Sequence, residues 1–149
     1  IGGLERERNV LRYRPVSTQV RGCADATLVD VARVVAAGLL ATGGDISVSL
    51  DPSLDEGLGR ALRSVGVAVT TASDEDWYAS LGASRVRLVG GNPSRAADEA
   101  DGDPDLALWA NEVTSAPQVE LLPFLREQSV SMTAHRFGNP DAGVLSVRL

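Results

Sequence analysis

The sequence contains no lysine, because all fourteen of its basic residues are arginine. This absence excludes the lysine of a Walker A phosphate loop and any chemistry through a lysine Schiff base. Twenty acidic residues give the chain a formal net charge of −6. A surface that binds nucleic acid needs a basic stripe, so we exclude DNA and RNA as partners.

Cysteine and histidine each occur once, as Cys23 and His135. One cysteine cannot form an internal disulfide, and one histidine cannot build a metal site without several nearby carboxylates. The acidic run Asp74-Glu75-Asp76 does not supply them, because adjacent residues at a helix start point in different directions. We therefore expect no metal site. A nucleophilic Cys23–His135 pair is the weaker interpretation and an incidental cysteine the favoured one, so we assign no catalytic residue.

Long apolar runs are also missing, since none approaches the roughly 20 residues of a membrane-spanning helix. We expect no membrane span, and the cysteine usage favours a reducing cytoplasm. The chain starts Ile-Gly-Gly without methionine, which predicts a piece of a longer protein or a processed product.

Residues 1–22 differ in charge from the rest of the chain. Five arginines and two glutamates give this segment about +3, which leaves about −9 for the remainder. We predict an extended basic arm or linker, with an edge strand in which Pro15 forbids a central position. The residues that alternate along that strand are Val10, Tyr13, Val16 and Val20.

A β-α repeat follows, with strand centres spaced by about twenty residues. Glycines and capping residues such as Thr27 and Ser73 mark the helix ends. Right-handed crossovers would place these strands parallel, with helices on both faces. The expected helices are 27–42, 52–65, 73–81 and 93–100, and the expected strands are 46–50, 67–71, 85–89 and 106–110.

The C-terminal part breaks this rhythm, and we predict edge strands or an arm over 118–125, 129–133 and 144–147. The expected fold is thus α/β, a Rossmann-like three-layer parallel sheet with an N-terminal arm and C-terminal edge strands. The predicted boundaries are 1–22 for the arm, 23–116 for the Rossmann-like repeat and 117–149 for the C-terminal strands of the same domain.

The glycine turn at 90–94 is the candidate ligand site. A strand that enters a helix through glycines is where doubly wound proteins hold phosphates on free N–H groups. Asn92 is a preferred N-cap and Pro93 suits the first helical position. A plain strand-to-helix turn explains the same residues, and no GxGxxG pattern is present. The candidate anion or cofactor residues are Gly90, Gly91, Asn92 and Ser94.

Two segments carry a resemblance to a known family. VELLPFLREQSVSMTAHRFGNP (119–140) and ERNVLRYRP (7–15) resemble the C-terminal region of bifunctional enzymes of the proline utilization A type, in the actinobacterial form. The rest of the chain resembles that region more loosely. In this family one domain with FAD oxidises proline to pyrroline-5-carboxylate, and an aldehyde dehydrogenase domain with NAD forms glutamate. Long members carry an additional non-catalytic domain with an aldehyde-dehydrogenase-like Rossmann fold, thought to cover the tunnel between the active sites.

The resemblance implies an interdomain flap, and the family's Val-Ser pair falls on Val130 and Ser131. The sequence departs from the family pattern at 135–137, where longer members often have small residues. The cysteine motif of the aldehyde dehydrogenase nucleophile is absent, and Cys23 does not match it. The expected flap residues are Arg126, Ser131, Thr133, His135, Arg136, Phe137, Gly138 and Asn139.

Two functions follow as expectations. The resemblance favours a non-catalytic domain of an enzyme that oxidises proline to glutamate, without a cofactor of its own, in a parent protein that uses FAD and NAD. Its partners would be the catalytic domains of its own chain, and an oligomer is compatible with this. The alternative is an independent α/β domain that binds a nucleotide or small ligand at the glycine turn.

Overall fold

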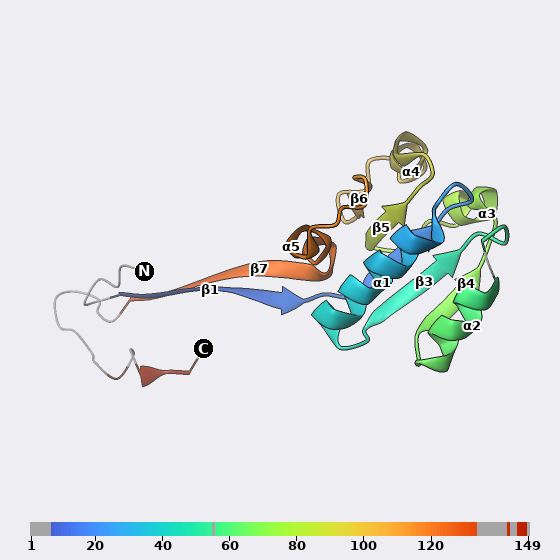
Figure 1. Ribbon diagram of the computed structural model, residues 1–149. Coiled ribbons are helices and arrows are strands. Elements are labelled where there is room, and N and C mark those ends of the chain that lie inside the picture. The colour runs from blue at the N-terminus through green and yellow to red at the C-terminus, as the bar shows by residue number, and fades with distance from the viewer. Residues whose placement is uncertain (1–6, 55, 134–142, 144–145, 149) are drawn as a thin grey trace. The chain divides into compact units, whose positions relative to one another are not determined.

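The computed structural model describes residues 7–54, 56–133, 143 and 146–148. The chain forms two compact units (Figure 1). The larger unit is Pro15–Leu125, and the smaller combines Ile1–Arg14 with Arg126–Leu149. None of the helices in the described ranges is long and apolar enough to cross a membrane.

The larger unit is built on a five-stranded parallel sheet of order β4-β3-β2-β5-β6. In the register of the central strands, Val20 lies between Val48 and Arg87. Within this sheet the chain passes first through the central strand β2, then through β3 and β4 to one edge, and then returns to form β5 and β6 on the other side, as in Rossmann-like folds. The strands are β2 (Thr18–Gly22), β3 (Ile46–Leu50), β4 (Ala68–Thr71), β5 (Arg85–Val89) and β6 (Ala107–Trp109).

Helices cover both faces of the sheet, and each face has its own core. One core joins valines of α1 to Phe124 and to apolar residues around α2, and the other surrounds Trp77 and Tyr78 of α3. Right-handed crossovers produce this division, and Figure 1 shows α1 in front of the strands. The predicted three-layer α/β fold is confirmed. The helices are α1 (Leu28–Thr42), α2 (Glu56–Ser64), α3 (Asp74–Ala79) and α4 (Pro93–Glu99).

The capping signals hold where they are strongest. Thr27 accepts a hydrogen bond from the Asp30 amide, and Ser73 accepts one from the Asp76 amide. Asn92 caps α4 with Pro93 at its start. The start expected for α2 at Asp51-Pro52 is wrong, because Asp51 accepts hydrogen bonds from Ser53 instead and α2 begins at Glu56.

The prediction of an extended arm is wrong for residues 18–22. Residues 18–22 form β2, the central strand, where Val20 and Arg21 are 0% exposed. The sequence TQVRG looks exposed because Gln19 and Arg21 interrupt the apolar pattern that marks a buried parallel strand. Both find partners inside the fold, since Gln19 accepts a hydrogen bond from the Trp77 indole and Arg21 donates to Ser49.

The strand predicted over 118–125 is also wrong. The segment forms α5 (Pro117–Glu120) and the 3₁₀ turn η1 (Leu122–Phe124) rather than a strand. Pro117 favours a helix start. Phe124 inserts its ring into the core between α1 and the sheet and is 0% exposed. Glu120 is buried too, on Arg87.

The smaller unit contains a two-stranded sheet of β1 (Glu7–Pro15) and β7 (Leu125–Thr133). The strands run in opposite directions (Figure 1), and Arg12 Nε donates to Gln128 Oε1 at 2.7 Å. The strand predicted over 129–133 is confirmed as part of β7. The strand predicted over 144–147 includes residues 144 and 145, which lie outside the described residues. The structure thus divides the predicted 1–22 segment between two units.

The buried ion pair between Arg87 of β5 and Glu120 of α5 generates a stability prediction. Its atoms lie 3.1 Å apart with side chains 0% and 2% exposed, and Glu120 also accepts a hydrogen bond from the Thr114 amide. Glu120→Ala would leave a buried unpaired guanidinium, so we expect a loss of about 3–5 kcal/mol in the free energy of unfolding, measured in urea.

The matched control for this change is Glu56→Ala. It breaks an exposed pair with Arg60 in which the arginine and glutamate side chains are 67% and 86% exposed, so it should cost under about 1 kcal/mol. Equal small losses in both variants would contradict the assigned importance of the Arg87–Glu120 pair.

Candidate functional site

A cavity among the described residues lies at the carboxyl end of the sheet. Its volume is about 500 Å³, and loops that follow β2, β5 and β6 line it. Strand order reverses between β2 and β5, and open α/β sheets hold ligands at such a switch point. The lining residues used below are Asp25, Thr27, Asp30, Gly90, Gly91 and Glu112.

The loop after β2 occupies the place of the phosphate-binding turn in dinucleotide-binding folds. That turn normally carries three glycines, whereas here residues 22–27 read Gly-Cys-Ala-Asp-Ala-Thr. The Asp25 carboxylate accepts a hydrogen bond from the Gly91 amide at 2.6 Å. An acidic side chain thus takes the N–H group that a phosphate would need.

Sequence reasoning missed this loop because it placed 18–22 in an arm. Recognising residues 18–22 as a strand would have made 22–27 the first strand-to-helix turn. The residues Asp25, Asp30 and Glu112 all line the cavity, and no arginine of the described ranges does. The cavity is therefore electrostatically unfavourable for a pyrophosphate.

The predicted glycine turn does lie at this cavity, but the amides of residues 91, 92, 94 and 95 already donate within the chain. The Asn92 amide donates to the Tyr78 hydroxyl at 2.8 Å, and the amides of Ser94 and Arg95 donate to the Asn92 side chain. Gly90 and Gly91 line the cavity, whereas Asn92 serves as the N-cap of α4. These four N–H groups, which were expected to be free for a ligand, are occupied by groups of the chain itself.

Close packing explains the two glycines. Gly91 has φ +73°, and a Cβ there would lie 2.5 Å from Cys23 Sγ and 2.7 Å from the Tyr78 hydroxyl oxygen. Gly90 has φ +71°, and its Cβ would lie 2.4 Å from an Asp25 oxygen. Both the backbone conformation and the space exclude a side chain.

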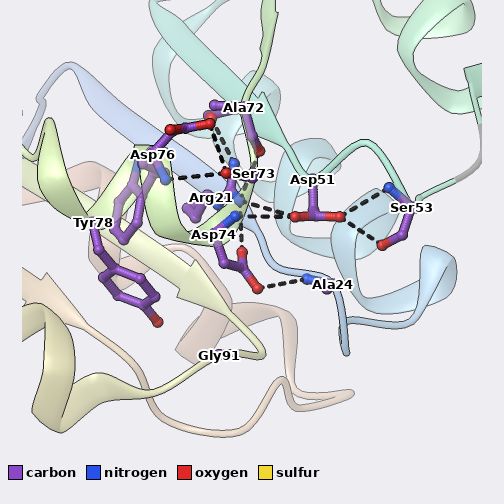
Figure 2. A network of polar contacts seen from close by, with 12 residues as sticks. Arg21, Ala24, Asp51, Ser53, Ala72, Ser73, Asp74, Asp76, Tyr78 and Gly91 are labelled. Atoms are coloured by element: carbon purple, nitrogen blue, oxygen red, sulfur yellow. Dashed lines mark hydrogen bonds and ion pairs between the residues drawn. The ribbon is translucent and has the colours of Figure 1, made fainter.

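Beside the cavity, the buried Arg21 of the central strand β2 binds groups at the carboxyl ends of the strands (Figure 2). Arg21 donates to Ser49 Oγ at 2.9 Å, to the Ala72 carbonyl at 3.0 Å and to Asp74 Oδ1 at 2.6 Å. Its guanidinium carbon lies 5.4 Å from the centre of the Trp77 ring. Asp51 adds a more distant charge, 3.7 Å from Arg21 Nη2.

Asp51 stands at the end of β3, where dinucleotide-binding folds place the acidic residue that binds a ribose. Here the carboxylate accepts hydrogen bonds from the Ser53 amide and hydroxyl and from the Asp74 amide. Figure 2 shows it between Ser53 on one side and Arg21 and Asp74 on the other. Burial acts to raise the pKa of Asp51, but the hydrogen bonds and Arg21 outweigh it, so the pKa is lowered. The ionised Asp51 carboxylate therefore holds the Ser53 turn and the start of α3 together through hydrogen bonds.

Cys23 lies beneath the glycine turn at 0% exposure. Burial, reinforced by Asp74, raises the pKa of its thiol to about 12. The thiolate is the nucleophilic form of cysteine, so this side chain is unsuited to covalent catalysis near neutral pH. His135, its candidate partner, lies outside the described residues.

The remaining candidates are dispersed. Asp74 binds Arg21 and Asp76 pairs with Ser73, so the acidic run 74–76 does not converge. Within the described ranges, no group of three or more acidic, histidine or cysteine side chains is arranged for a metal ion. Of the expected flap residues, Arg126, Ser131 and Thr133 lie in β7. The flap residues outside the described part are His135, Arg136, Phe137, Gly138 and Asn139.

These features define an α/β domain of Rossmann-like topology whose switch-point cavity is acidic and internally hydrogen-bonded. Neither a family model nor a curated protein matches the sequence. Among solved structures, the chain is similar to Proline Utilization A (PutA) from Corynebacterium freiburgense, with 27% identity and a TM-score of 0.54. The similarity covers 91% of this chain and 11% of that chain. The chain is thus related in sequence and fold to a domain-sized part of PutA.

The packing at Gly91 can be tested against a matched glycine. Gly102 has the same φ, +73°, but a Cβ there would meet nothing within 4 Å. Gly102→Ala should cost about 1 kcal/mol through backbone strain alone, and Gly91→Ala at least about 2 kcal/mol more because it also overlaps Cys23 and Tyr78. Urea unfolding measures both, and equal losses would contradict the close-packing explanation.

Proposed function

We propose that the chain is a non-catalytic, Rossmann-like domain of a longer enzyme that oxidises proline to glutamate. The observation that carries this proposal is the similarity to PutA over nearly the whole chain, at 11% of the length of PutA. A match of that shape is typical of one domain in a multidomain chain. The longer enzyme would bind FAD and NAD in its catalytic domains and act in the cytoplasm.

The geometry of the switch-point cavity supports a non-catalytic role. The two positions that bind pyrophosphate and ribose in dinucleotide folds carry Asp25 and Asp51, and both carboxylates bond to the chain itself. Cys23 is buried with a thiol pKa of about 12. Described residues at the cavity therefore offer neither a phosphate cradle nor an activated nucleophile.

We assign the contact with the catalytic domains to the smaller unit. Its described residues form a two-stranded sheet, β1 with β7, in which Leu11 and Tyr13 of β1 are 61% and 54% exposed. Isolated two-stranded sheets are marginal in water, so this unit gains most from a neighbouring surface. Segments 7–15 and 125–133 also contain residues that resemble the proline utilization A family. We assign them the covering of the tunnel that carries the intermediate.

A second candidate function rests on the cavity volume of about 500 Å³, which is large enough for a small ligand. A domain that binds a nucleotide there would need the Gly91 amide free of Asp25. NAD titration separates the two functions. We expect no saturable heat up to millimolar NAD by calorimetry with the 149-residue chain, and no NADH formed from pyrroline-5-carboxylate.

The Asp25→Ala variant is titrated with NAD in parallel with the unchanged chain. It removes the side chain that occupies the Gly91 amide and one of the cavity's negative charges. Micromolar NAD binding by the unchanged chain would favour the second function. Weak binding that appears only in Asp25→Ala would identify Asp25 as the group that closes the site.

The covering role is tested by deletion in the longer enzyme. Removing residues 129–149 should slow the coupled conversion of proline to glutamate more than either half-reaction measured separately, because the intermediate would escape to solvent. The measurement is a stopped-flow or steady-state lag in NADH formation. Thermal unfolding checks that the deletion variant is folded. A stable deletion variant without a lag would contradict the covering role.

A further inference from the structure

Helix α1 has apolar side chains on both of its faces. Val31, Val34, Val35 and Gly38 are buried against the sheet. The outer face carries Val29 and Leu40, which are 64% and 77% exposed, with Ala36 between them. Residues 29, 33, 36 and 40 fall on one stripe at helical spacing. Arg33 is the charged residue in that stripe, and Asp30 neutralises it at 3.1 Å.

The outer faces of α2 and α4 carry charge pairs. α2 presents the exposed pair Glu56–Arg60, and α4 presents Arg95 and Glu99 one turn apart. Such i,i+4 charge pairs are typical of a face in contact with water. Among the ion pairs of the described residues, α1 contributes the local pair of Arg33 with Asp30. α1 differs by the two exposed aliphatic side chains, Val29 and Leu40, that accompany its ion pair.

A groove continues this stripe. It lies between α1 and the segment 114–121 and has a volume of about 280 Å³. Its apolar lining is Ala36, Ala37, Leu40, Pro117 and Leu121, and its polar lining is Arg33, Thr114, Ser115 and Glu120. The buried pair of Glu120 with Arg87 fixes the far wall of this groove to the sheet. The wall is therefore held in place independently of any partner.

The size of this surface restricts what can cover it. The helix is about 22 Å long and about 10 Å wide, so its outer face offers roughly 250 Å². A stable interface between separate proteins buries about 800 Å² on each partner. A tethered partner needs far less, because the linker raises its effective concentration to the millimolar range. A surface of this size suits a neighbour in the same chain.

We propose that the outer face of α1 and the adjoining groove, defined by Val29, Ala36, Leu40, Pro117 and Leu121, pack against an apolar, uncharged surface of the longer chain. This inference rests on the proposed function only for the existence of that chain. It identifies a docking surface in the larger unit, distinct from β1 and β7. The partner surface would insert apolar side chains beside Leu40 and avoid any charge opposite it.

Thiol labelling tests the proposal by accessibility rather than activity. Leu40→Cys places a thiol on the proposed face, and Val65→Cys is the control, because Val65 is 68% exposed in the turn after α2. In the longer enzyme we expect maleimide to label the thiol of Leu40→Cys at least about tenfold more slowly than that of Val65→Cys, with sites assigned by peptide mass spectrometry. In the 149-residue chain at low concentration, the two introduced thiols should react at similar rates.

Cys23 is an internal check on folding, because it is buried with a thiol pKa of about 12 and reacts only if the domain opens. Equal labelling of both introduced thiols in the longer enzyme, with Cys23 protected, would overturn the proposal. Protection at position 40 that rises with the concentration of the 149-residue chain would overturn it in favour of a second copy as the occupant. Protection at position 40 in a longer chain that does not oxidise proline would uphold the docking surface and reject the proposed function instead.

Discussion

The buried guanidinium of Arg21 is the constraint on which the rest of the larger unit depends. A charge at 0% exposure in the central strand is tolerated only if its partners are fixed in place. Those partners come from three other segments: Ser49 of β3, the Ala72 carbonyl after β4, and Asp74 at the start of α3. The strands must therefore align at their carboxyl ends before Nη1 and Nη2 of Arg21 gain these partners, whereas Nε has no hydrogen-bond partner among the described residues.

The same requirement closes the region where related folds bind nucleotides. Asp74 bonds Arg21 with one oxygen and the Ala24 amide with the other, which ties the loop after β2 to the start of α3. That loop presents Asp25 to Gly91, and Gly91 in turn covers Cys23. A continuous set of internal contacts thus runs from Arg21 to the glycine turn. Polar groups that would recognise a ligand are used to hold the loops together.

Sequence reasoning recovered the elements with local signals and missed those defined by distant partners. The Asn92-Pro93 and Thr27 caps, and the apolar runs of β3 and β5, depend on neighbouring residues, so they were predictable. β2 was not, because Gln19 and Arg21 look solvent-exposed until Trp77 and Asp74 are placed beside them. Glu120 in α5 also looks solvent-exposed in the sequence until its distant partner Arg87 is placed beside it. The glycine turn was located correctly, but its occupation by Asp25, 66 residues earlier, has no local signal.

Because the loops around the switch-point cavity use polar groups to bind one another, we expect contacts with a partner on the outer surfaces of the larger unit, and these surfaces are unequal. α2 and α4 carry exposed ion pairs, whereas α1 exposes Leu40 and Val29 in addition to its Arg33–Asp30 pair. Exposed apolar area is unfavourable in water by about 25 cal/mol per Å², and the packing of the described residues does not require it at these two positions. Glycine at position 38 shows how tightly the opposite face is packed, since a Cβ there would lie 2.7 Å from the Phe124 ring. The inner face of α1 is thus fully specified by its own domain, and the proposed docking surface accounts for the exposed Val29 and Leu40 of its outer face.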